Sequence, residues 1–191
     1  YTLLVLGVGL FGKSPYKNVI VNGLILAEDG QKMSKSKNNY PPILPLIEKY
    51  SADAFRFLLM QSPSVKSEDY AFSEKAVDEI NKKVLMRLQN VVSFYEMYAG
   101  ESSVKEYKNS QNVLDTWIVS RLNQTIELVT KHFDLYEIDK GVRPIADFID
   151  DLSTWYLRRS RDRFKSDDLE DKNNAIQTTK VVLLELSKVI A

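Results

Sequence analysis

Four segments of this chain repeat apolar residues every three or four positions, which is the period of an amphipathic α-helix. Four such stripes with short connections bury themselves best against one another, so the pattern predicts a helical bundle. The stripes comprise Val77, Ile80, Val84, Leu88, Val91 and Tyr95; Leu114, Trp117, Ile118, Leu122, Ile126, Val129 and Phe133; Ile145, Phe148, Leu152, Trp155 and Tyr156; and Ile176, Leu183, Leu186, Val189 and Ile190.

Polar and flexible residues mark the expected ends of these helices. Ser73 is suited to the N-cap of the first helix, because its hydroxyl accepts a backbone N–H there. Gly100 is suited to the C′ position after its last turn, and the polar run "GESSVKEYKNSQN" predicts a loop. Pro144 either kinks the third helix or marks its first turn, and Asn173 or Asn174 is expected to cap the fourth.

The composition excludes several classes of site. The 26 basic and 26 acidic residues cancel, so contact with nucleic acid depends on local clusters of charge. The chain has no cysteine, which excludes disulfides and thiolate metal sites. Its single histidine, His132, argues against a zinc site and is expected to be an ordinary surface or boundary residue.

The segment before Pro63 has a mixed pattern. Its opening run "TLLVLGVGLF" is apolar on all sides and predicts a buried core element. The run is too short to span a bilayer and lacks the basic start of a signal peptide. The β-branched run from Lys17 to Ala27 predicts a strand with a bend at Gly23.

Turn and helix signals follow this strand. Asp29-Gly30 predicts a turn, and the run "ILPLIEKYSADAFRFLLM" predicts two short helices that meet at Ser51. We therefore divide the chain into residues 1–63, with a mixed α/β pattern, and residues 64–191, with a helical one.

The run "DGQKMSKSKNNYPP" concentrates Lys32, Lys35 and Lys37 around the short side chains of Ser34 and Ser36. Accessible backbone N–H groups, hydroxyls and ammonium groups in one loop suit a polyphosphate. Such binding is catalytic where it strengthens in the transition state. The alternative is a solvated, lysine-rich turn, and the glycine-rich P-loop signature G-x-x-x-x-G-K-[ST] is absent.

Lys32-Met33-Ser34-Lys35-Ser36 spells the KMSKS signature, by which the chain resembles class I aminoacyl-tRNA synthetases. In that family the loop follows the last strand of the catalytic domain and precedes a helical stem-contact region, and the order of segments here is similar. The resemblance implies a mainly α chain. It would hold the C-terminal remnant of a Rossmann-like α/β catalytic domain, followed by a helical-bundle anticodon-binding domain truncated at its C-terminus.

The resemblance also implies a reaction. The enzyme would join an amino acid to ATP, release pyrophosphate and pass the aminoacyl group to tRNA. Lys35 is implied to stabilise the departing pyrophosphate with assistance from Lys32, and Met33, Ser34 and Ser36 to complete the ATP site with them. Mg²⁺ is implied by the ATP chemistry, although no cluster of metal ligands is visible in the sequence.

The residues after the signature bear on the amino acid. Asn38-Asn39-Tyr40-Pro41 is similar to the isoleucyl branch, whereas valyl, leucyl and methionyl relatives tend to carry Gly-Asn here. This implies isoleucine and tRNA(Ile) as substrates, with the other three branches or a non-catalytic tRNA-binding module as alternatives. The family's H-x-G-H signature is absent, so we expect a piece of a longer enzyme that is inactive alone. The full-length parent is expected to be a cytoplasmic monomer without membrane association.

A cluster of cations ends the third helix. Its members are Arg158, Arg159, Arg161, Arg163 and Lys165. Guanidinium groups pair with RNA phosphates and stack on bases, whereas the alternative is a helix end whose cations complement the macrodipole. The run resembles the "WY…R…R" helix of the anticodon-binding domain in the isoleucyl, valyl, leucyl and methionyl group, which implies contact with tRNA.

The spacing of this helix predicts which face is buried. The stripe of Phe148, Leu152 and Trp155 continues at helical spacing onto Arg159 and Arg163, so one face would be docked at one end and exposed at the other. We expect Trp155, Tyr156 and the Trp117 of the preceding helix to be core anchors.

Overall fold

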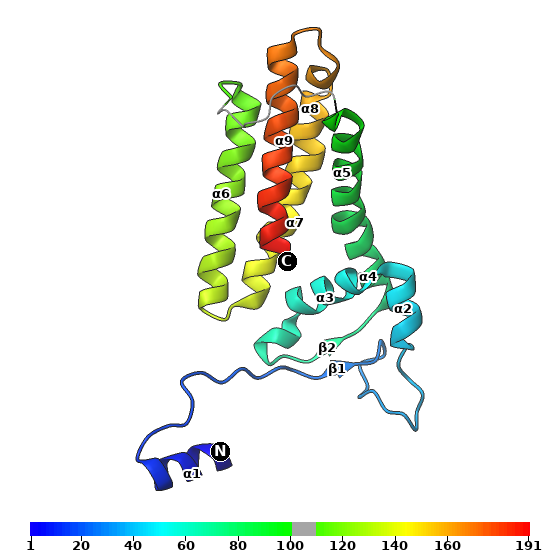
Figure 1. The fold of residues 1–191 in the computed structure, drawn as a ribbon. Coiled ribbons are helices and arrows are strands. Elements are labelled where there is room, and N and C mark those ends of the chain that lie inside the picture. The colour runs from blue at the N-terminus through cyan, green and yellow to red at the C-terminus, as the bar shows by residue number, and fades with distance from the viewer. Residues whose placement is uncertain (101–109) are drawn as a thin grey trace.

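The computed structural model describes residues 1–100 and 110–191 as a mainly helical chain (Figure 1). The connection predicted after Gly100 lies largely in 101–109, outside the described residues. The α-helices and strands are α1 (Thr2–Phe11), β1 (Ile25–Leu26), α2 (Ile43–Tyr50), α3 (Ala52–Gln61), β2 (Tyr70–Ala71), α4 (Glu74–Ile80), α5 (Met86–Ala99), α6 (Val113–Asp134), α7 (Ile138–Asp150), α8 (Arg158–Ser160) and α9 (Leu169–Ile190). Short helical turns are η1 (Pro63–Lys66), η2 (Asn81–Leu85), η3 (Asp151–Leu157) and η4 (Arg163–Lys165).

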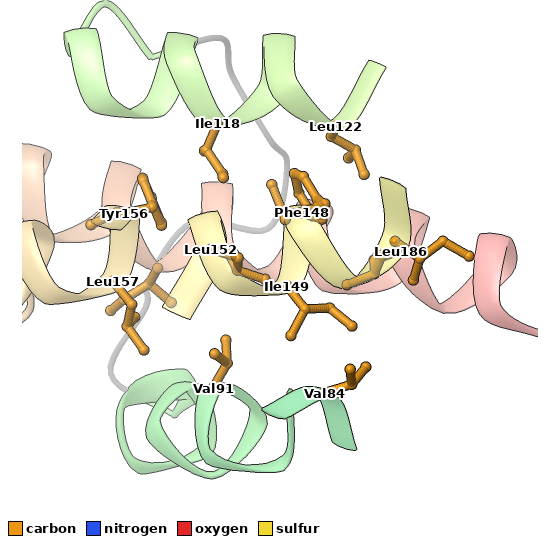
Figure 2. Packing of buried hydrophobic residues seen from close by; sticks show 14 of the residues in the cluster. Val84, Val91, Ile118, Leu122, Phe148, Ile149, Leu152, Tyr156, Leu157 and Leu186 are labelled. Carbon is orange, nitrogen blue, oxygen red and sulfur yellow. The ribbon is translucent and has the colours of Figure 1, made fainter. Parts of the chain in front are cut away.

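The predicted helical bundle is confirmed. Two of its long helices are composite: α4, η2 and α5 follow one another without a break, and so do α7, η3 and α8. These two rods pack with α6 and α9 around one apolar core, and Figure 2 shows side chains from the bundle helices converging on it. Val91, Ile118, Phe148, Leu152 and Val182 are completely buried there.

A π-helical turn changes the face that the third stripe presents to the core. In η3 each turn takes up about one residue more than in an α-helix. The buried residues therefore follow a spacing of four, as Phe148, Leu152, Tyr156, Ser160 and Phe164. The prediction that Tyr156 is a core anchor is confirmed.

The same slip of one residue makes the prediction for Trp155 wrong, because its side chain is 47% exposed. Trp117 is partly buried, packs against the bundle core and lies 6.4 Å from Trp155 between ring centroids. The predicted stripe failed at Trp155 because periodicity assumes a regular α-helix, and the sequence has no strong local marker for a π turn.

Several helix ends differ from their predictions. Asp168, rather than Asn173 or Asn174, caps α9, accepting the N–H groups of Glu170 and Asp171. Ser73 occupies the N-cap position of α4 but its side chain makes no capping hydrogen bond.

Two further helix predictions concern a glycine and a proline. Gly100 follows α5 with φ −75°, so it does not adopt the left-handed C′ conformation. Pro144 lies inside α7, in its second turn, instead of in the first. The meeting of α2 and α3 at Ser51 is confirmed, and the Ser51 hydroxyl accepts the Ala54 N–H.

The strand predicted from Lys17 to Ala27 is regular over two residues only. β1 pairs in parallel with β2, with Ile25 opposite Tyr70 and Leu26 opposite Ala71. The chain before β1 is extended, and a Cβ at Gly23 would lie 1.9 Å from the Glu68 carbonyl oxygen. Gly23 is therefore a point of close backbone approach, which only glycine permits.

A second, smaller core joins this sheet to the bundle. It comprises Leu46, Tyr50, Ala54, Leu58, Phe72 and Val77 from α2, α3, α4 and the end of β2. The division of the chain at Pro63 stays a prediction.

Helix α1 lies apart from the bundle at the end of a long extended segment (Figure 1). The prediction of a buried core element is wrong for this helix, because Gly7 is its one buried residue. Its leucines, valines and Phe11 are exposed, since the described part of the chain provides no apolar layer to cover them. No helix within residues 1–100 and 110–191 combines the length and apolar character needed to cross a membrane.

Candidate nucleotide-binding loop and nucleic-acid interface

The base of the lysine-rich loop is fixed to the end of β1. Leu26 forms an isolated antiparallel bridge with Lys32, and the Ala27 N–H donates to the Gln31 carbonyl at 2.8 Å. Between them the chain reverses at the predicted turn, where Gly30 has φ +77° and donates its N–H to Ala27. The loop therefore begins at a defined position relative to the sheet.

The tip of the loop is a short helical turn. The Lys37 N–H donates to the Ser34 carbonyl at 3.2 Å, and the Asn38 N–H donates to the Lys35 carbonyl at 3.3 Å. Asn38 then has φ +47°, in the left-handed region that asparagine tolerates better than most residues. The hydroxyls of Ser34 and Ser36 lie 2.8 Å apart.

The lysines of the tip differ in their surroundings. The Lys37 ammonium donates to the Gln31 side-chain oxygen at 3.0 Å. Lys32 and Lys35 are exposed, and within the described residues neither ammonium group has a carboxylate or hydrogen-bond partner. Two uncompensated cations beside two hydroxyls form a surface suited to a polyanion.

Asn39, which the sequence analysis did not single out as a site residue, closes the loop from its far end. Its side-chain oxygen accepts the Ser34 N–H at 2.8 Å, and its side-chain nitrogen donates to the Lys32 carbonyl at 3.2 Å. Met33, between these two residues, packs its side chain against the smaller core. The Asn-Asn pair after the signature was a signal that could have indicated this role.

The cation cluster lies at one end of the bundle, over α8 and η4. Arg158, Arg159, Arg161 and Lys165 are exposed. The Arg159 guanidinium lies 3.9 Å from the Trp155 ring centroid, a cation–π contact on the solvent side of the helix.

Arg163 occupies a different environment from the rest of the cluster. It is 9% exposed, and its guanidinium donates to both oxygens of Asp115 at 2.7 and 2.8 Å. It also donates to Asp171 through Nε and Nη2, the shortest contact being 2.7 Å. Tyr156 donates its hydroxyl to Asp115 at 2.8 Å. The expectation that Arg163 faces tRNA therefore conflicts with its position, because its donors are already used inside the bundle.

The ion-pair network shifts the pKa values of its members. Burial opposes the charge on Arg163, but hydrogen bonds to Asp115 and Asp171 outweigh it and raise the pKa of Arg163. The hydrogen bonds from Arg163 lower the pKa of Asp171. Burial, with the charge of Asp115, raises the pKa of Tyr156. These pKa shifts keep Arg163 and Asp171 in their ionised forms and Tyr156 neutral.

His132 is half-buried and its Nδ1 lies 2.7 Å from Glu137 Oε2, which confirms an ordinary boundary histidine. In the part of the chain that the structure describes, no group of three or more acidic or histidine side chains could hold a metal ion.

Two family models match this arrangement. Residues 1–73 match tRNA synthetases class I (I, L, M and V), and residues 115–191 match the anticodon-binding domain of tRNA ligase. The chain belongs to the class I tRNA synthetases of the isoleucine, leucine, methionine and valine group.

Within that group, the chain is similar over its whole length to isoleucine–tRNA ligases. It is 44% identical over 196 residues to that of Chlamydia trachomatis serovar D, covering 100% of this chain and 19% of the ligase. It is 43% identical over 195 residues to that of Bdellovibrio bacteriovorus, covering 100% of this chain and 18% of the ligase. The chain thus spans about one fifth of the length of the curated relatives it matches.

Solved structures share the fold. LeuRS of Agrobacterium radiobacter K84, in a ternary complex with tRNA and LeuAMS, has a TM-score of 0.69 and 16% identity, covering 99% of this chain and 24% of that one. Mycobacterium tuberculosis methionyl-tRNA synthetase bound by methionyl-adenylate has a TM-score of 0.69 and 22% identity, covering 87% and 34%. The mainly helical fold that the sequence predicted, with an anticodon-binding bundle, is confirmed.

Proposed function

We propose that this chain supplies the pyrophosphate-stabilising loop and the tRNA-facing helices of an ATP-dependent isoleucine–tRNA ligase. The observation that carries the proposal is that Lys32 and Lys35, on an anchored loop, are exposed and have no partner among the described residues. Similarity to isoleucine–tRNA ligases over the whole chain supports isoleucine as the amino acid. Valine is the second candidate.

In the proposed reaction the isoleucine carboxylate attacks the α-phosphorus of ATP, and the bond to the leaving pyrophosphate breaks. Negative charge accumulates on the pyrophosphate as that bond lengthens. Lys35 would follow and neutralise this charge, with Lys32 beside it, and Met33, Ser34 and Ser36 would line the nucleotide site with backbone and hydroxyl groups. Contacts that strengthen as charge develops lower the barrier to reaction.

The described residues do not fit a metal site of their own, so no step of the proposed reaction is assigned to Mg²⁺. The chain's contribution to charge neutralisation would come from its lysines.

For tRNA we propose the exposed face of α8 and η4. Arg158, Arg159, Arg161 and Lys165 present cations that no carboxylate of the described residues pairs. Trp155 adds a half-exposed aromatic surface beside them. We further propose a cytoplasmic, monomeric full-length enzyme that charges tRNA(Ile).

The proposal is tested by amino-acid-dependent ATP–pyrophosphate exchange in the full-length ligase. We expect isoleucine to support the fastest exchange and Lys35→Ala to slow it by about 100- to 1,000-fold, the usual effect of removing one transition-state contact. Lys37→Ala is the matched control and should change the rate little, because Lys37 is paired with Gln31. Exchange led by valine would correct the specificity. Absence of exchange with any of the four amino acids would favour a non-catalytic tRNA-binding protein.

A further inference from the structure

We propose that Asn39 is the positioning residue of the lysine loop, fixing Lys32 and Lys35 for pyrophosphate through the backbone. This inference rests on the proposed function, because it names how the same loop is held in its active shape. Asn39 lies outside the five-residue signature and contacts no phosphate in this role.

The side-chain amide of Asn39 accepts one hydrogen bond and donates another, as a backbone peptide group does. A primary amide carries one acceptor and two donors. In this chain the acceptor takes the Ser34 N–H at 2.8 Å and a donor reaches the Lys32 carbonyl at 3.2 Å. These two backbone groups flank Met33, so one side chain holds both sides of a single residue, as a neighbouring strand would.

We call these two hydrogen bonds of Asn39 the clamp. It acts on a stretch of the loop that no secondary structure holds. The antiparallel bridge between Leu26 and Lys32 ends at Lys32, and the turn of the tip starts at the Ser34 carbonyl. Asn39 spans the interval between these two anchors. Met33 is held from the other side by its packing against the smaller core.

The requirement for asparagine follows from this geometry. Alanine would supply neither hydrogen bond. Aspartate would accept the Ser34 N–H but would place a second acceptor against the Lys32 carbonyl, and the two oxygens would repel. Glutamine is one methylene longer and would have to displace the loop to make both bonds.

Holding the backbone on both sides of Met33 also holds the backbone from which the Lys32 and Lys35 side chains extend. Lys32 and Ser34 are the clamped residues, and Lys35 follows directly at the start of the exposed turn. A long lysine side chain searches a smaller volume when its backbone is held, so less ordering remains to be done in the transition state. Loss of the clamp should therefore lower the catalytic rate more than it weakens substrate binding.

The first test examines the clamp itself in the 191-residue chain, by amide hydrogen exchange. We expect Asn39→Ala to speed exchange of the Ser34 amide by about fivefold to tenfold, as expected for loss of one hydrogen bond. Asn38→Gly is the matched control: it removes a neighbouring asparagine side chain that makes no hydrogen bond with described residues and retains the positive φ. Unchanged Ser34 exchange in Asn39→Ala would overturn the clamp.

The second test uses pyrophosphate exchange by the full-length ligase. We expect Asn39→Ala to lower kcat by about tenfold or more with a smaller change in the KM for isoleucine, and Asn39→Asp to be similarly impaired. In a Lys32→Ala, Lys35→Ala background, Asn39→Ala should have little further effect, because the clamp acts through these two lysines.

The outcomes separate this inference from the proposed function. If Lys35→Ala is impaired and Asn39→Ala is not, the loop functions without the clamp and the inference is wrong. An Asn39→Ala effect that persists in full in the background without Lys32 and Lys35 would also overturn it. If Lys35→Ala itself has normal activity, the proposed function of the loop fails first.

Discussion

At the scale of single residues, two arginines of the same cluster have opposite roles. Arg159 is exposed and stacks on Trp155, whereas Arg163 joins two carboxylates inside the bundle. The difference comes from Asp115, which is 1% exposed and has to be neutralised by a cation. Charge alone therefore does not identify the residues that are free to bind RNA.

Replacing Arg163 should destabilise the fold. Arg163→Met would leave Asp115 buried without its cation, and breaking a buried ion pair in this way costs about 3–5 kcal/mol. For a chain of this length, each kcal/mol corresponds to about 2–4 °C in Tm, which thermal unfolding measures. Arg159→Met, the exposed control, should change Tm by no more than a few degrees. Equal Tm values for the two variants would contradict a structural role for Arg163.

At the scale of the elements, the π turn η3 decides which side chains enter the core. Over the eight residues from Phe148 to Tyr156, a regular α-helix would rotate the second side chain by about 80° from the first. The extra residue in η3 removes most of that rotation, so both side chains point into the bundle. Trp155 is left on the solvent side, beside Arg159.

Deleting Thr154 should be tolerated better than an ordinary deletion inside a helix. Thr154 is exposed within η3, so its loss would convert the turn to a regular α-helix and keep Tyr156 and Phe164 in register. Deleting the exposed Asn123 from the regular helix α6 would instead rotate Thr125 and all later core residues by about 100°.

Circular dichroism and thermal unfolding of the two deletion variants provide the measurement. We expect the Thr154 deletion to retain cooperative unfolding with a modest loss of Tm, and the Asn123 deletion to lose cooperative unfolding. The opposite ranking would show that the π turn is not what sets the register.

At the scale of the whole molecule, one segment connects the loop-bearing sheet to the bundle. Residues 62–71 accept hydrogen bonds from the extended chain before β1, from the Gly23 N–H to the Ser64 carbonyl and from the Leu24 N–H to the Asp69 carboxylate. On its other side the same segment presents Lys66, whose ammonium lies 2.6 Å from Asp139 at the start of α7. Asp139 is 1% exposed, whereas Lys66 is partly exposed, so only the carboxylate of this ion pair is buried.

Removing Lys66 should weaken that connection. Lys66→Met leaves the carboxylate of Asp139 with the more distant Arg143, at 3.4 Å, and we expect a loss of about 2 kcal/mol, less than the roughly 3–5 kcal/mol for breaking a fully buried ion pair, because Lys66 is itself partly exposed. Denaturant unfolding of the chain measures it. Lys82→Met, which breaks an exposed pair with Asp78, is the control and should change the stability little, because water screens exposed ion pairs. A Lys66 variant as stable as the control would contradict this role.

Local sequence patterns determined most of the helices of this protein and the positions of two of its turns. The four apolar stripes, the turn at Gly30 and the meeting of two helices at Ser51 follow from side-chain periodicity and backbone preference, which act over a few neighbouring residues. The KMSKS run is likewise read from the sequence alone, and its lysines are exposed in the structure.

Tertiary structure decided what depends on distant partners. Asp115 is distant from Arg163 in the sequence, and Asp171 lies on a different helix. Only the packing of these helices brings both carboxylates to Arg163, where an RNA contact was expected. The π turn η3 was likewise visible only in the packed bundle, where it places Tyr156 in the core and leaves Trp155 on the solvent side. Helix α1 shows the converse, because an apolar pattern establishes a need for burial but only a packed neighbour provides it.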